Sequence, residues 1–230
     1  MTDNPQQLSR PAAFKGSLFL LFVVLVLISY HFIYPLLGIT LISATTLFIS
    51  RILFWVATIL LWFYSIKVDQ QPLFIWNEKK YGAGFYALSM VVLFVIIIIG
   101  VVLIQHILSI SGLLKKSDVV SEMTKNFRNN MPLLLFTCLT AGVTEEIIFR
   151  AFLLPRLEVA FNKPWLAILL SSLLFGLGHA GFGTIVNIAV PVFIGLIFAW
   201  HYWKYRNIKV IMVFHFCWDL LVLLLSLKAH

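Results

Sequence analysis

Long apolar segments separated by short polar connections dominate the pattern of this 230-residue chain. Seven segments have the length of a membrane span, at about residues 17–37, 48–66, 84–110, 131–157, 164–180, 184–203 and 207–227. A helix crosses hydrocarbon in about 20 residues, so each segment predicts a transmembrane helix. The stretch 38–47 is also apolar and predicts an eighth, partial element. No segment shows the alternating pattern of a β-barrel strand.

The composition agrees with a membrane protein, because 61% of the residues are hydrophobic and 11% are charged. A soluble domain carries roughly 25% charged residues. We therefore predict an all-α integral membrane protein, a bundle of about 7–8 transmembrane helices. Cys138 and Cys217 both fall within apolar segments, which argues against a disulfide framework. The apolar run that follows Arg10 and Lys15 is longer than a signal-peptide core, so it predicts a retained first span.

The chain is interpreted as one structural domain with two parts. Residues 1–130 should hold about three transmembrane helices and two polar loops, 67–83 and 111–130, the second of which predicts a surface helix. Residues 131–230 should form the catalytic core. The net charge of +8 lies mostly in the connections, which suits anionic lipid better than nucleic acid. The positive-inside rule favours a cytoplasmic N-terminus, although the basic loop 111–130 opposes it.

Three charged residues in the segment 131–157 are the first sign of chemistry: Glu145, Glu146 and Arg150. A charge at bilayer depth costs about 2.5–3.5 kcal/mol or more, so it marks a functional site by default. Residues four apart share a helix face, so Glu146 and Arg150 should form a buried ion pair. Glu145 points elsewhere and has no local cation, which leaves it free to bind a water or a proton.

Two later segments offer polar groups at the same spacing. Phe175 and His179 stand four apart, as do His215 and Asp219. Three helices therefore present polar groups that predict one shared polar cavity within the membrane. Each motif alone has a plainer interpretation, as a structural ion pair or a hydrogen bond between helices, and only their joint occurrence indicates a site. Arg51 is expected to snorkel to the interface, outside this set.

Some intramembrane chemistries are excluded by missing motifs. There is no His-Glu-x-x-His for a zincin and no Gly-x-Ser-Gly for a serine protease, and Asp219 is the only aspartate within the predicted spans. Glu145, His179 and His215 could in principle bind zinc with an open coordination position. The same groups also suit a scheme without metal, in which a carboxylate and an imidazole share the activation of water.

The ordered set Glu145-Glu146-x-x-x-Arg150, Phe175-x-x-x-His179 and His215-x-x-x-Asp219 resembles the CPBP family of CAAX proteases and bacteriocin-processing enzymes, also called ABI. The resemblance covers about residues 131–225. It implies an intramembrane glutamic endopeptidase without cofactor. Glu145 and His179 would activate water, and His215 with Asp219 would line the oxyanion site. Glu146, Arg150 and Phe175 would support the site.

The last motif position holds Asn or Asp in that family, and the difference affects the chemistry. An ionised Asp219 would repel an oxyanion, so it is either protonated or orients His215 as the donor. The expected partners are a peptide or membrane-protein substrate and the lipid bilayer. Short loops without compartment signals favour a bacterial plasma membrane. The rival hypothesis is a scaffold or bacteriocin-immunity protein that keeps the fold without proteolysis, and a proton-coupled transporter is a third.

Overall fold

The computed structural model describes residues 8–36 and 42–228, with side chains for residues 8–24 and 42–228, and this part of the chain is helical without strands. Its elements run in the order α1 (Arg10–Leu36), α2 (Ala44–Tyr64), η1 (Ser65–Asp69), α3 (Ala83–Ile110), α4 (Asp118–Arg128), α5 (Met131–Thr140), η2 (Ala141–Glu145), η3 (Ile147–Leu153), α6 (Leu154–Phe161), α7 (Pro164–Leu177), η4 (Ala180–Phe182), α8 (Val186–Tyr205) and α9 (Ile208–Lys228).

Six helical stretches within the described residues are long and apolar enough to cross a membrane. They are Ala44–Asp69, Ala83–Ile110, Met131–Phe161, Pro164–Phe182, Val186–Tyr205 and Ile208–Lys228. The prediction of an all-α, multi-pass membrane protein is therefore confirmed. The predicted first span falls on α1, but residue 37 and the first part of the predicted partial element at 38–47 lie outside the described residues. Ala44–Leu47 belongs to the start of α2.

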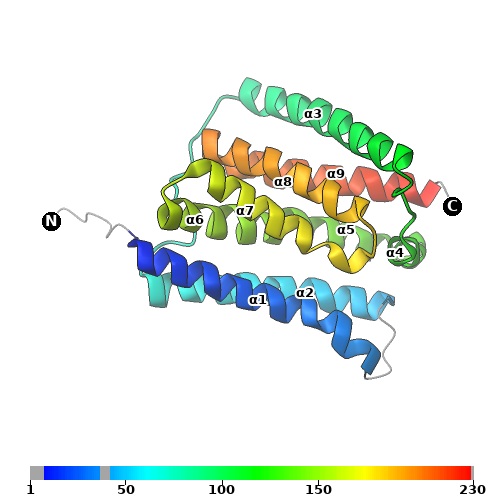
Figure 1. Cartoon of the computed structure of the whole chain (residues 1–230), viewed down its shortest axis with the longest axis horizontal. Helices are drawn as coiled ribbons and strands as arrows, with labels where there is room; N and C mark the ends of the chain where they lie inside the picture. Colours follow the sequence, from blue (N-terminus) through cyan, green and yellow to red (C-terminus); the bar gives the residue numbers. More distant parts are fainter. Residues whose placement is uncertain (1–7, 37–41, 229–230) are drawn as a thin grey trace.

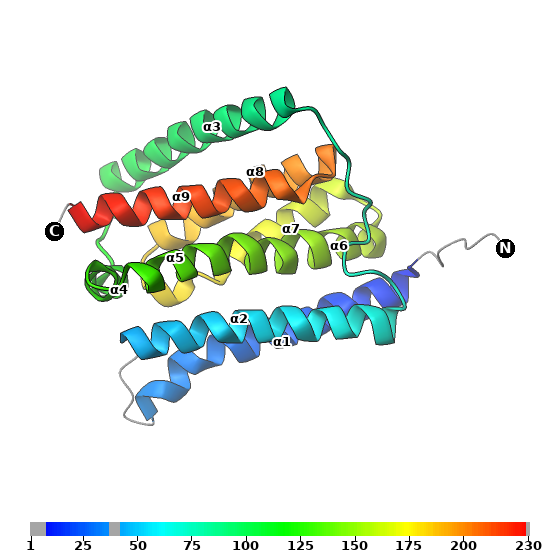
Figure 2. The same cartoon turned by 180° about the vertical axis from the view of Figure 1, so that it is seen from behind.

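The helices pack in layers (Figures 1 and 2). α1 and α2 lie together on one side, α3 lies on the opposite side, and α5 to α9 fill the space between them. α4 crosses one end of the bundle beside α5 and confirms the surface helix predicted within 111–130. The large buried cluster spans α1, α2, α3 and the central helices, and a smaller one joins α2, α4, α5 and α9.

Local sequence signals set several helix boundaries. Ser43 caps α2, because its hydroxyl accepts a hydrogen bond from the backbone N–H of Thr46. In turn, the backbone N–H of Ser43 donates to Thr46 Oγ1, which completes a capping box. Asn130 caps α5 in the same position, and Pro132 follows in its first turn, where a missing N–H is tolerated. Asn162 ends α6 in the left-handed conformation at φ 54°. These residues thus set where α2 and α5 begin and where α6 ends.

Gly142 allows an unusually close helix contact. A Cβ atom there would lie 2.9 Å from the Met212 carbonyl oxygen and 2.9 Å from the Phe216 nitrogen. α9 can therefore pass directly against η2 only because this position lacks a side chain. The contact brings the segment of α9 that carries His215 next to the glutamates.

A buried charge cluster joins α6 to η1 at the end of α2, and no spacing in the sequence predicts it. We expected Asp69 in the polar loop 67–83 and Arg156 at the end of its span, but helical structure continues through η1 and both residues are buried. Arg156 Nε and Nη2 donate to Asp69 Oδ2 at 2.9 and 2.7 Å, and Nη2 also donates to Ser65 Oγ at 2.6 Å. We call Ser65, Asp69 and Arg156 the clamp.

Candidate active site

The segment that carries the two glutamates is not a regular α-helix. Ala141–Glu145 and Ile147–Leu153 form successive π-helical stretches on either side of Glu146. Thr144 Oγ1 donates to the Thr140 carbonyl at 2.7 Å, a local bond of the kind that bends helices. π-helical turns occur frequently at functional sites. No proline lies in this stretch, so nothing in the hydropathy pattern predicts the distortion.

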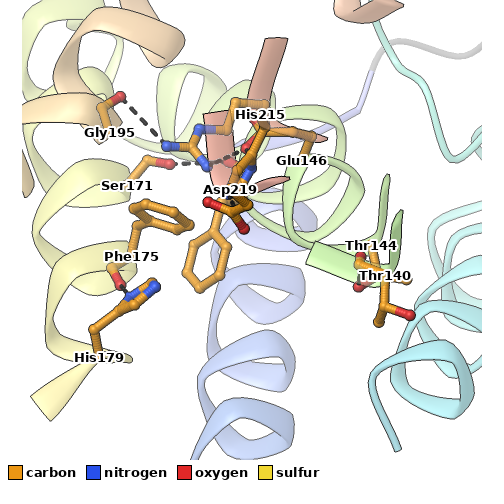
Figure 3. Close-up of polar contacts among 11 residues, drawn as sticks. Thr140, Thr144, Glu146, Ser171, Phe175, His179, Gly195, His215 and Asp219 are labelled. Carbon is orange, nitrogen blue, oxygen red and sulfur yellow. Dashed lines mark hydrogen bonds and ion pairs between the residues drawn. The ribbon is translucent and has the colours of Figure 1, made fainter. Parts of the chain in front are cut away.

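Four charged or titratable side chains form a continuous chain across two segments. Arg150 Nη1 donates to Glu146 Oε1 at 3.0 Å, and the same oxygen lies 2.8 Å from His215 Nδ1. The other ring nitrogen of His215, Nε2, lies 3.5 Å from Asp219 Oδ2. Figure 3 shows Glu146, His215 and Asp219 facing one another. Because Glu146 is held by two donors, it is fixed in place.

Arg150 is completely buried and is held from several directions. Its Nη2 lies 3.5 Å from the Gly195 carbonyl oxygen of α8. Its guanidinium carbon stands 4.2 Å from the centre of the Phe175 ring and 5.6 Å from that of Phe198. Aromatic faces attract a cation most strongly where water is excluded. Arg150 therefore connects the glutamate helix to both α7 and α8.

His179 lies just beyond the end of α7, with one ring nitrogen already engaged. Nδ1 lies 2.9 Å from the Phe175 carbonyl oxygen, and because a carbonyl only accepts, Nδ1 must carry the hydrogen. In the neutral ring, Nε2 then has a free lone pair. The Phe175 ring is 4.9 Å from the His179 ring and 6.1 Å from the His215 ring, so both histidines share this neighbour (Figure 3).

Glu145 differs from its neighbour in having no such partners. It is 7% exposed, and its Oε2 has no hydrogen-bond partner among the described residues. Its charge nevertheless acts on both His215 and Asp219. Asp219 also lies within electrostatic range of His179, and its side chain is 31% exposed. The three motifs thus meet in one place, and Glu145 is the carboxylate left free within it.

The contact between His215 and Glu146 is the part of the site that the sequence analysis missed. The two residues are 69 positions apart, so no local spacing connects them. Ser171 was also not foreseen; its hydroxyl donates to the Phe149 carbonyl at 2.9 Å and ties α7 to η3. Among the side chains that the structure describes, no three His, Cys, Asp or Glu residues are grouped as a metal-binding set.

A family comparison agrees with this geometry. Residues 127–221 match the family model described as Type II CAAX prenyl endopeptidase Rce1-like. This stretch, less than half of the chain, is similar to that family. All seven candidate site residues lie within it, and the resemblance noted from the three motifs is confirmed. No curated protein and no solved structure matches the chain. At the level of the family, the match supports a membrane-embedded peptidase.

Proposed function

We propose that this CAAX endopeptidase-like protein is a metal-independent glutamic endopeptidase that cleaves a peptide bond within or at the edge of the bilayer. The observation that carries the proposal is the contrast between two adjacent glutamates. Glu146 binds Arg150 and His215 through its Oε1, whereas the buried Glu145 has no hydrogen bond or ion pair to any described residue. A buried carboxylate without a partner is costly unless it binds water or substrate.

The reaction follows from which atoms remain free. Glu145 accepts a proton from a water molecule that the His179 Nε2 lone pair helps to position. The resulting hydroxide attacks the carbonyl carbon of the substrate, and the carbonyl oxygen becomes an oxyanion. Protonated His215 donates from Nε2 to that oxyanion, while Nδ1 stays fixed on Glu146. Glu145 then transfers its proton to the leaving amine as the C–N bond breaks.

The substrate is proposed from the family alone. The family description names prenyl endopeptidases, so a peptide with a prenylated cysteine near its C-terminus is the first substrate to test. Leader peptides and membrane-protein fragments are the alternatives in a bacterial plasma membrane. In either case we propose a cytoplasmic N-terminus, as the distribution of lysine and arginine favours.

The purified full chain should cleave a farnesylated C-a-a-X peptide, and Glu145→Gln should lower kcat/KM by about 100-fold or more, as the loss of a general base does. The melting temperature should change little, because glutamine keeps the shape of the side chain. Glu122→Gln on the exposed face of α4 is the matched control and should keep full activity. Near-normal cleavage by Glu145→Gln would remove Glu145 from the role of base.

The same assay also tests the proposed independence from metal. Prolonged treatment with a chelator should leave the rate unchanged, and the purified protein should contain no stoichiometric zinc. Activity that is lost on chelation and restored by zinc but not magnesium would instead make Glu145, His179 and His215 ligands. If the folded wild type releases no peptide from the farnesylated probe or from its own membranes, the scaffold hypothesis replaces the enzyme.

A further inference from the structure

Arg51 is a cation within a membrane span that lacks an ion-pair partner among the described residues. It belongs to α2, inside the span Ala44–Asp69. Its Nε donates to Ser50 Oγ at 3.3 Å, and its guanidinium lies 5.4 Å from the centre of the Phe54 ring. Neither contact neutralises the charge. An arginine at this depth normally has a partner or a function.

The residues around Arg51 show that this face of α2 contacts α5. One turn earlier, the Phe48 ring packs 5.4 Å from the Phe136 ring. One turn later, Trp55 Nε1 donates to Thr140 Oγ1 at 3.1 Å. Residues separated by three or four positions share one helix face. Arg51 therefore lies along the α2–α5 contact.

α9 brings Asp219 to the same region. Phe216, Leu220 and Leu223 of α9 pack in the smaller buried cluster, together with Leu47 of α2 and Cys138 of α5. Asp219 is three residues from Phe216 and four from Leu223, so it borders that cluster. Arg51 is four residues from Leu47 of the same cluster, so the two charges border it from two different helices. The ion pairs of the described residues include one between His215 and Asp219 but none between Arg51 and Asp219, so any influence of Arg51 on Asp219 acts across this cluster.

The charges of the site explain why such a cation is needed. Three carboxylates, those of Glu145, Glu146 and Asp219, converge on it, and Arg150 is occupied by Glu146. His215 lies between Glu146 and Asp219. The proposed oxyanion would add another negative charge beside Asp219. Such repulsion is strong in a low-dielectric site.

We propose that Arg51 is a positioning residue that offsets the negative charge of Asp219, so that His215 Nε2 donates to the oxyanion instead of being held by the carboxylate. Arg51 acts through Asp219 and does not touch the reacting atoms. This inference rests on the proposed proteolytic function, and it predicts that Arg51 matters only while residue 219 carries an acid.

A double-mutant cycle on the full chain tests the coupling. Arg51→Gln should lower kcat/KM for the farnesylated C-a-a-X peptide by about tenfold, and by less than about twofold when Asp219→Asn is also present, a difference typical of coupled charges. Arg51→Lys should retain most of the activity because it keeps the charge. Lys67→Gln removes an exposed positive charge from the same span and should change little in either background.

The melting temperatures of the wild type, Arg51→Gln, Asp219→Asn and the double variant provide a readout that does not require proteolysis. Arg51→Gln should lower the melting temperature when Asp219 is present and leave it nearly unchanged together with Asp219→Asn. If the wild type cleaves no peptide, the proposed function fails while this cycle still tests the pair. Equal effects of Arg51→Gln in the two backgrounds, on kcat/KM or on the melting temperature, would overturn the inference and leave Arg51 as a snorkelling residue.

Discussion

Charged side chains that are completely buried define this protein at the scale of single residues. Glu146, Arg150 and Arg156 have no exposed surface, yet each has an oppositely charged partner. Removing one member of a buried pair is far more damaging than removing a surface pair, because the remaining charge stays in a low-dielectric interior. Stability and the geometry of the site therefore depend on the same few side chains.

Arg150→Ala should lower the free energy of unfolding by about 3–5 kcal/mol, because it leaves the Glu146 carboxylate with His215 alone. Thermal unfolding of the purified protein measures the effect. Lys125→Ala is the matched control, since it breaks an exposed pair with Glu122 that should contribute only about 0–1 kcal/mol. Similar shifts for the two variants would contradict the structural role of Arg150.

What the sequence predicts about residues depends on their separation along the chain. The pairing of Glu146 with Arg150 follows from a spacing of four, which places both on one helix face. The hydrogen bond between His215 and Glu146 does not follow from spacing, because it depends on how closely α9 approaches η2. The roles proposed for Glu145, His179 and Asp219 remain predictions, although the structure brings their motifs together.

At the scale of helices, the spans are predictable from apolar runs, but their ends and distortions are not. A hydropathy pattern treats a charged residue as exposed, so Asp69 was predicted in the polar loop 67–83 and Arg156 at the end of the segment 131–157. The structure instead buries both residues, and helical structure runs to Asp69 in one case and beyond Arg156 to Phe161 in the other. The π-helical turns at Ala141–Glu145 also left no trace in the pattern.

Gly142→Ala should disturb the site without removing any functional group. The added Cβ would press on the α9 backbone at Met212 and Phe216 and shift His215 away from Glu146. Because a displacement of about 1 Å can cost about 100-fold in rate, we expect kcat/KM to fall by at least tenfold. The assay is cleavage of the farnesylated C-a-a-X peptide, together with thermal unfolding.

Gly84→Ala is the control for that substitution. Gly84 lies in the first turn of α3, and a Cβ there would meet nothing within 4 Å. Alanine favours a helix over glycine by about 1 kcal/mol, so this variant should be neutral or slightly more stable. If Gly142→Ala behaves in the same way, close approach at Gly142 does not position His215.

At the scale of the whole molecule, the clamp is a buried polar connection between η1, at the end of α2, and α6 of the central helices. Asp69→Leu should lower the free energy of unfolding by about 3–5 kcal/mol, because Arg156 would remain buried without its counter-charge. Combining it with Arg156→Met should recover much of that loss, since an apolar pair can replace a buried ion pair. Thermal unfolding of both variants measures this, and no recovery in the double variant would show that Arg156 acts through other contacts.

The clamp also has a consequence for biogenesis. Residues 127–221, which carry the family match, include Arg156 but not Asp69 or Ser65. During synthesis η1 with Asp69 emerges before α6 with Arg156. The acidic partner is therefore already in the membrane when Arg156 arrives. The segment that carries the family match is therefore not a portable module. Moved into another bundle, it would enter the lipid with an unpaired guanidinium, and its new host would have to supply an acid at the matching depth.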